Sequence, residues 1–136
     1  MKLLMFHVDE FWYRTYSKTL ENVDTQEKEE KTNEGIVAFI HVEKEDEEKG
    51  NKLKGKAADN IRWLLKKTNT NSVVLHSFAH LSESKSSPEF AQKLIEDLKS
   101  SLEERQIITY VTPYGYFLEF KLHVLGESLA KVFKSF

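Results

Sequence analysis

The sequence has no cysteine, only two prolines and five glycines, and no long apolar run. The lack of cysteine excludes disulfides, thiolate nucleophiles, and zinc or iron–sulfur sites built on cysteine. No segment is apolar and long enough to cross a membrane, and no signal-peptide core is present. A chain of 136 residues with charges of both signs and no linker or repeat is expected to fold as one soluble, cytoplasmic domain, residues 1–136.

The charge pattern excludes a strongly basic nucleic-acid-binding protein. The net charge is −2 and the isoelectric point is near 6.2, whereas such proteins exceed about 9. The charge is uneven, because residues 1–50 carry 7 basic and 13 acidic side chains and residues 51–136 carry 13 and 9. A local basic stretch, Lys52–Lys67, indicates either contact with phosphates or a solvated helix face.

Apolar periodicity predicts an α/β (α+β) fold, in which a mixed sheet is layered with two main helices and a short C-terminal helix. The first helix is expected at Lys54–Lys67, and the second starts at an N-cap, Ser87, followed by Pro88. The third is expected at Ser128–Phe136, with Leu129, Val132 and Phe133 facing inward. The expected strands are Lys2–Asp9, Phe11–Lys18, Ile36–Glu43, Ser72–Phe78, Ile107–Val111 and Tyr116–Val124.

Three connections complete this expected layout. Asp9-Glu10 is predicted to turn the chain between the first two strands. The acidic segment Glu21–Glu34 lacks periodicity and is predicted to be a mobile loop. Gly115, in the turn before the last strand, is expected to adopt positive φ.

Common catalytic signatures are absent. The sequence holds no GxGxxG, P-loop, HExxH or GxSxG motif, so we expect no cofactor and no metal. Four of the five histidines lie in expected strands, and His76 and His80 straddle a strand end, where a spacing of four does not place both on one face.

Two segments are candidates for a binding site. Phe78–Ser82 (FAHLS) follows a strand and precedes a helix, at the sheet edge where α/β proteins gather ligands. Thr112–Phe117 (TPYGYF) is an aromatic turn that is able to line a pocket or stack on a base. On position alone, backbone capping by His80 and hairpin packing by the turn are the commoner readings.

Four sequence blocks together resemble the archaeal threonyl-tRNA synthetase editing domain. They occur in the family's order, and the similarity covers essentially the whole chain. The blocks are KxLxxHxD at Lys2–Asp9, AFIxVEK at Ala38–Lys44, FAHLS at Phe78–Ser82 and PYGY at Pro113–Tyr116. The resemblance implies a D-aminoacyl-tRNA deacylase-like fold, a homodimer, and hydrolysis of serine wrongly attached to threonine tRNA. A site that admits only the smaller side chain corrects an error that synthesis cannot avoid.

The resemblance also implies roles for particular residues. Its pocket histidine corresponds to His80, and the family's lysine position holds Leu118. We therefore hypothesise that Lys131, at a closing-helix position of the family, supplies the missing ammonium as a catalytic group together with His80. The residues implied to bind substrate are His7, Asp9, Val42, Glu43, Ala79, Tyr116 and Phe117.

The resemblance also implies partners, and it leaves an alternative function open. The expected partners are the acceptor end of seryl-tRNA, a second copy of the chain and the threonyl-tRNA synthetase catalytic chain. A non-catalytic domain that binds tRNA or an aminoacyl-adenosine end, or that serves dimerisation, is the alternative, since Leu118 cannot hydrogen-bond a water or an oxyanion.

Overall fold

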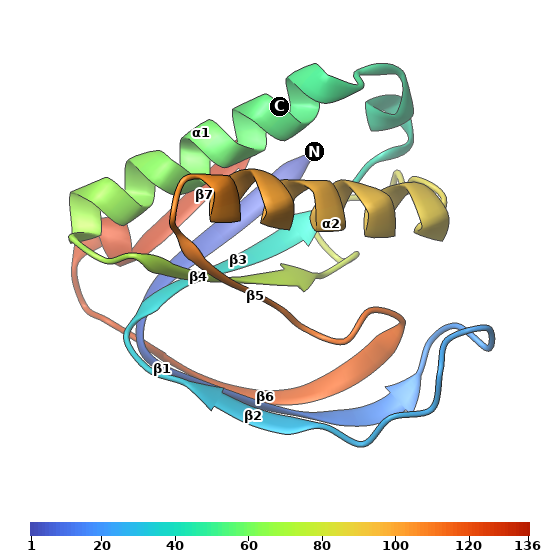
Figure 1. Ribbon diagram of the computed structural model, residues 1–136, viewed down its shortest axis with the longest axis horizontal. Helices are drawn as coiled ribbons and strands as arrows, with labels where there is room; N and C mark the ends of the chain where they lie inside the picture. Colours follow the sequence, from blue (N-terminus) through green and yellow to red (C-terminus); the bar gives the residue numbers. More distant parts are fainter.

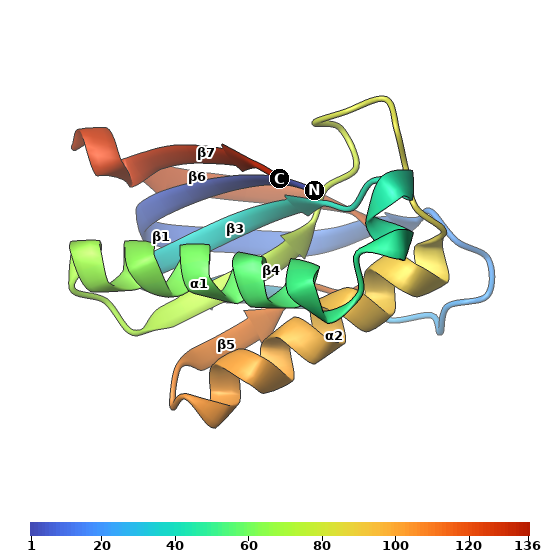
Figure 2. The same ribbon diagram turned by 90° about the horizontal axis from the view of Figure 1, so that it is seen from above.

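In the computed structural model, which describes residues 1–136, one long N-terminal strand organises a single mixed sheet, and two helices cover one face of it (Figures 1 and 2). The helices are α1 (Asn51–Thr68) and α2 (Pro88–Glu104), and short 3₁₀ turns lie at η1 (Lys44–Glu48) and η2 (Ser128–Ala130). The strands are β1 (Lys2–Lys18), β2 (Glu29–Thr32), β3 (Gly35–His41), β4 (Ser72–Ser77), β5 (Ile108–Val111), β6 (Tyr116–Val124) and β7 (Lys131–Ser135).

Strand β1 is paired along both of its edges. On one edge it runs antiparallel to β3 and then to β2, and on the other to β7 and then to β6. Strands β4 and β5 extend the sheet from β3 in parallel. The register of β1 against β6 shifts between Val8 and Glu10, which marks a β-bulge.

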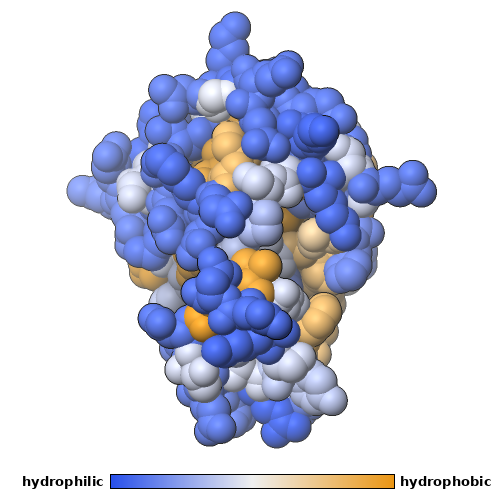
Figure 3. Space-filling model, turned by 90° about the vertical axis from the view of Figure 1, so that its right-hand side faces the viewer, coloured by the Kyte–Doolittle hydropathy of each residue, from blue (hydrophilic) through white to orange (hydrophobic).

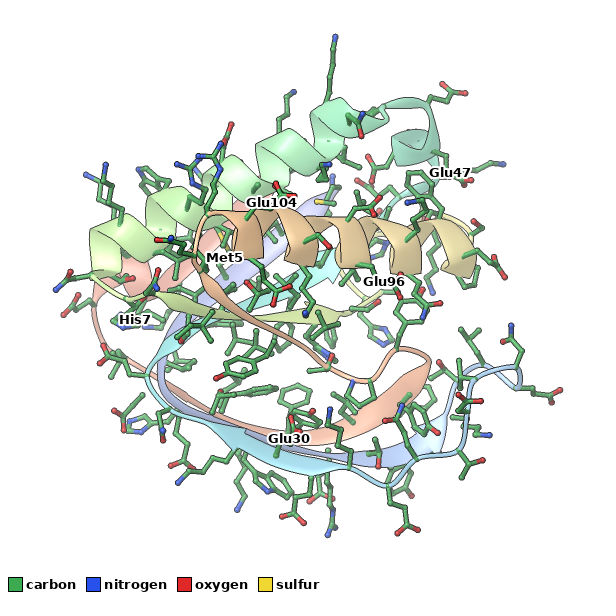
Figure 4. The ribbon with its side chains drawn as sticks, in the orientation of Figure 1. Met5, His7, Glu30, Glu47, Glu96 and Glu104 are labelled. Atoms are coloured by element: carbon green, nitrogen blue, oxygen red, sulfur yellow. The ribbon has the colours of Figure 1, made fainter.

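The sheet is buried on both faces along β3, and two apolar clusters result. The first lies between the sheet and the two helices and contains the buried residues of α1 and α2. The second lies on the opposite face, where β6 curls beneath β3 and β4 and side chains fill the space between them (Figure 4). At its centre, the Phe39 ring lies 5.6 Å from that of Phe120 and 4.8 Å from that of Phe78.

The helix signals of the sequence are confirmed. The Ser87 hydroxyl accepts a hydrogen bond from the Phe90 N–H at 3.2 Å, and Pro88 is the first helical residue of α2. Helix α1 ends at Asn69, whose φ of 55° is the left-handed conformation common at helix ends. Gly115 adopts φ 81°, as expected for its turn.

Two expectations for the N-terminal half are wrong. Asp9-Glu10 does not reverse the chain, because the two expected strands form one continuous strand, β1, that bends at the bulge. The segment Glu21–Glu34 is not entirely loop, because β2 within it pairs with Phe11–Arg14.

The expected C-terminal helix is also wrong. Residues Lys131–Ser135 form β7, which pairs with Lys2–Phe6, and only the short turn η2 precedes it. In this strand Val132 packs against the first cluster, whereas Phe133 is 53% exposed. The layered α+β class itself, with two main helices on a mixed sheet, is confirmed. None of the helices is long and apolar enough to cross a membrane.

The second cluster is predicted to be a major source of stability. Replacing Phe39 by Ala removes a ring that is 4% exposed and is expected to lower the free energy of unfolding by about 3–5 kcal/mol. Tyr16→Ala, at a side chain 79% exposed, is the matched control and is expected to change it by about 0.5 kcal/mol or less. Urea unfolding followed by circular dichroism measures both. Equal losses in the two variants would contradict the assignment of the second cluster.

Candidate functional site

A cleft of about 340 Å³ opens where β4 ends, α2 starts and β6 begins. The loop after β4 contributes Ala79, His80 and Lys85, and the turn before β6 contributes Tyr116 and Phe117. The surface on this side is mostly hydrophilic, and apolar residues show in the hollows between the polar side chains (Figure 3). The two candidate segments of the sequence thus line one cleft, although β5 and β6 do not form a hairpin.

His80 lies on the cleft wall and its side chain is exposed. Its ring stands edge-on to that of Phe78, with centroids 4.9 Å apart, and Phe78 belongs to the second cluster. The imidazole is thus supported by the core on one side while its polar edge remains accessible to solvent.

The loop that carries His80 is held by a buried histidine of β3. The Leu81 N–H donates to Nδ1 of His41 at 3.0 Å, so Nδ1 is an acceptor, and Nε2 of His41 donates to the Ser84 carbonyl at 2.7 Å. The Ser86 N–H donates to the Val42 carbonyl at 3.1 Å. Val42 was expected to bind substrate, but its side chain lies in the first cluster, and its backbone anchors the loop instead.

Glu43 has a similar supporting position. Its carboxylate accepts from the Met1 α-ammonium at 2.9 Å and from the Ser82 hydroxyl at 2.8 Å. Burial opposes ionisation, but these hydrogen bonds and the nearby Lys2 outweigh it and lower the pKa of Glu43 to about 2. Glu43 does not line the cleft, so its expected contact with substrate is replaced by a role in fixing the loop.

His76, from β4, forms part of the inner wall of the cleft. Its side chain is buried among Phe39, Phe78 and Phe120, and Nδ1 lies 2.8 Å from the Thr112 hydroxyl. Burial lowers the pKa of His76 to about 4, so its imidazole is neutral at neutral pH.

The aromatic turn contributes rings rather than hydroxyl groups. The Tyr116 hydroxyl donates to the Asp24 carbonyl at 2.6 Å and accepts from the Gln26 N–H at 2.9 Å, which ties down the loop before β2. The Tyr114 hydroxyl donates to the Pro88 carbonyl at 2.8 Å, and burial raises its pKa. Phe117 is 54% exposed at the rim.

Lys85, not Lys131, is the lysine that lines the cleft. Leu118 lines the cleft and packs against the second cluster, as an apolar floor. The expectation that Lys131 shares this pocket is wrong, because Lys131 lies on β7 and its Nζ donates to the Leu125 carbonyl at 3.0 Å. Among the residues that line the cleft, Lys85 carries the one permanent charge, and no carboxylate is present.

His7 and Asp9 also lie outside the cleft. His7 is buried in β1, and its Nε2 lies 2.9 Å from a Glu34 carboxylate oxygen. Asp9 is exposed at the bulge, 3.6 Å from His123. Neither of these two residues of the matching block therefore lines the cleft.

Sequence reasoning missed Lys85 and undervalued His76. Lys85 stands in a serine-rich loop with no periodicity, and only the position of that loop after β4 hinted at a site. His76 was interpreted as an ordinary strand histidine. That interpretation describes its packing correctly, but it does not include its position on the inner wall of the cleft.

Comparisons with known proteins agree with this geometry. A family model described as the archaea-specific editing domain of threonyl-tRNA synthetase matches residues 1–136. A threonine–tRNA ligase of Methanosphaera stadtmanae is 35% identical over 134 residues, 97% of this chain and 22% of the relative. Another, of Methanocaldococcus jannaschii, is 32% identical over 132 residues, 97% of this chain and 21% of the relative. The chain spans about a fifth of the length of these curated relatives.

A solved structure supports the fold. The c-Myc DNA unwinding element binding protein superposes with a TM-score of 0.68, covering 99% of this chain and 98% of its own, at 11% identity. At that identity the likeness bears on the fold alone, and it confirms the D-aminoacyl-tRNA deacylase-like class expected from the sequence.

The neutral state of His76 predicts how stability depends on pH. The folded pKa of about 4 lies below the ordinary value of 6.5, so between these values the unfolded chain binds more protons. The free energy of unfolding should therefore fall as pH drops from about 6.5 to about 4, by about 3 kcal/mol in total. His76→Gln should remove this slope, whereas His80→Gln should retain it. Urea titrations across this range decide the point, and an unchanged slope in His76→Gln would contradict the prediction.

Proposed function

Because the chain belongs to the family of archaea-specific editing domains of threonyl-tRNA synthetase, we propose that it hydrolyses the ester of seryl-tRNA(Thr). The observation that carries this proposal is the open cleft, which the exposed residues His80 and Lys85 line together with aromatic and aliphatic side chains. Such a cleft suits a terminal adenosine, whose base can stack on rings, joined to a small amino acid.

The proposed reaction is the attack of a water on the aminoacyl carbonyl carbon. The new C–O bond forms a tetrahedral oxyanion, the bond to the ribose oxygen then breaks, and a proton returns to that ribose oxygen. The products are free serine and a tRNA with an intact terminal hydroxyl. No protein nucleophile is needed, and the cleft offers no cysteine or carboxylate that would act as one.

The cleft residues fall naturally into two roles. The exposed His80 imidazole is suited to orient the attacking water or a ribose hydroxyl by hydrogen bonding. Lys85 is suited to stabilise negative charge on the oxyanion or on the terminal phosphate, since no carboxylate lining the cleft neutralises it. In this proposal Lys85 takes the place that was expected for Lys131.

Selectivity for serine follows from size. Serine lacks the methyl group of threonine and enters any pocket that admits threonine, so a synthetic site discriminates poorly between them. A second site that excludes the extra methyl group removes the error. The wall formed by Phe78, Leu118 and Phe120 is able to limit the size of the side chain that enters the cleft. Closely packed rings and branched side chains move little to make room for an extra methyl group.

Partners of the domain are part of the proposal. On the sheet face opposite the helices, Leu4, Phe6 and the exposed Phe133 form an apolar surface that suits a second copy of the chain. The catalytic chain of a threonyl-tRNA synthetase is the other proposed partner, and tRNA as substrate would place the domain in the cytoplasm.

The second candidate is a non-catalytic domain that binds the aminoacyl end of tRNA. Leu118 favours it, because an aliphatic side chain on the floor of the cleft neither donates a hydrogen bond nor stabilises an oxyanion. This candidate retains binding to the cleft and predicts no release of amino acid.

Incubation with labelled seryl-tRNA(Thr) and threonyl-tRNA(Thr) tests the proposal. Serine should be released faster than threonine, and Lys85→Met or His80→Ala should each slow the release by about 10² or more. Lys131→Met, which lies outside the cleft, should keep the wild-type rate. Binding of seryl-tRNA without release of either amino acid would support the second candidate. Full activity of Lys85→Met would refute the assigned role of that lysine.

A further inference from the structure

A second groove lies at the end of the molecule away from the cleft. It has a volume of about 420 Å³ and runs between the C-terminal half of α1 and the start of β5. Its polar lining includes Arg62, Lys66 and Asn71, and Trp63 supplies an aromatic wall. We call it the α1 groove. In Figure 1 it belongs to the side where α1 ends and β5 begins, opposite the start of β6.

Two basic residues, Arg62 and Lys66, line this groove with one acidic residue, Asp59, although the chain as a whole carries −2. Helix α1 holds six basic side chains and one acidic one, Asp59. Strand β7 adds Lys134, whose Nζ lies 5.2 Å from the centroid of the Trp63 ring. The contact between Arg62 and Asp59, 3.5 Å long and open to solvent, is weak and leaves the guanidinium available.

Trp63 indicates what kind of anion fits. It is 39% exposed on a helix whose other large apolar residues are buried, and one cation, the Lys134 ammonium, lies beside its ring. Free phosphate needs charge alone, whereas an RNA strand offers phosphates and bases or riboses together. Basic side chains beside an exposed aromatic ring are the combination by which proteins hold nucleic-acid strands without reading sequence.

The position of the groove relative to the cleft sets which part of an RNA could reach it. Pro88, at the start of α2, lines the cleft, and Ile107, three residues after its end, lines the groove. A helix of 17 residues is about 25 Å long, at 1.5 Å per residue. An RNA that inserts its aminoacyl end in the cleft can therefore reach the groove only with nucleotides well behind that end.

We propose that the α1 groove binds the sugar–phosphate backbone of the tRNA whose aminoacyl end occupies the cleft. This inference rests on the proposed function, and it adds a contact that depends on backbone charge and on stacking against Trp63. The groove supplies affinity for the body of the tRNA, while the cleft supplies the chemistry.

The two tryptophans allow a direct binding test with the full chain. Trp12→Phe leaves Trp63 as the one tryptophan, because the sequence has two. Titration with unacylated threonine tRNA should quench its fluorescence. Adding Arg62→Glu and Lys66→Glu should weaken binding at least tenfold and reduce the slope of log K against log salt by about 1.5. Lys93→Glu with Lys99→Glu, on the exposed side of α2, makes the same change of net charge and should leave the slope unchanged.

A second readout separates this inference from the proposed function. Hydrolysis of a seryl ester of adenosine, which is too short to reach the groove, should be equal in wild type and in Arg62→Glu/Lys66→Glu. If neither protein hydrolyses the ester while tRNA binding still depends on Arg62 and Lys66, the proposed function fails and the groove stands. The groove proposal is overturned if Arg62→Glu/Lys66→Glu and the control Lys93→Glu/Lys99→Glu weaken tRNA binding equally. It is also overturned if neither pair of substitutions weakens tRNA binding. The variant Arg62→Gln/Lys66→Gln removes the two positive charges without adding negative charges that repel the tRNA phosphates. It should weaken tRNA binding less than Arg62→Glu/Lys66→Glu does.

Discussion

The bend of β1 is the constraint on which the rest of the structure depends. A 17-residue strand that stayed flat would leave one face of the sheet open to water along its whole length. The bulge after Val8 turns its second half, with β6 attached, beneath β3 and β4. Because of this bend, Phe11 and Phe39 pack against Phe120 and the second cluster forms. The bend also brings the start of β6 to the end of β4, and the cleft exists because these two points of the chain meet.

The loop over the cleft is held in place by two groups, His41 and Glu43, that do not line the cleft. Both ring nitrogens of His41 form hydrogen bonds with the backbone of residues 81–84. The Glu43 carboxylate links the same loop to the Met1 ammonium. A loop fixed by buried polar bonds keeps an exposed side chain in place without covering it. This explains why a sequence block that resembles a binding motif contains residues that never face the cleft. Its glutamate and valine are hydrogen-bonded to the loop that carries His80.

The sequence predicted those features that depend on neighbours along the chain. The N-cap Ser87 and Pro88, the buried strand β3 and the turn at Gly115 are local, and each was found where it was expected. It could not predict β7, because Leu129, Val132 and Phe133 fit a helical spacing, and a segment this short shows no alternation that would contradict it. What decides its conformation is the free edge of β1, more than a hundred residues away. The same applies to the site: His80 and Tyr116 follow from motifs, whereas Lys85 enters the cleft through the path of a loop.

The position of Lys85 gives a physical reason for a leucine on the cleft floor. Residue 118 lies on the face of β6 that packs against the second cluster, next to Phe120 and the buried His76, whose pKa is lowered by the same surroundings. An ammonium at residue 118, which is half-buried between this cluster and the cleft, would lose part of its hydration, and no carboxylate lines the cleft to compensate it. A lysine on the exposed loop keeps its hydration until a negatively charged ligand arrives. Positive charge in the cleft and an apolar floor beneath it are thus compatible, provided that the charge comes from the loop rather than from the strand.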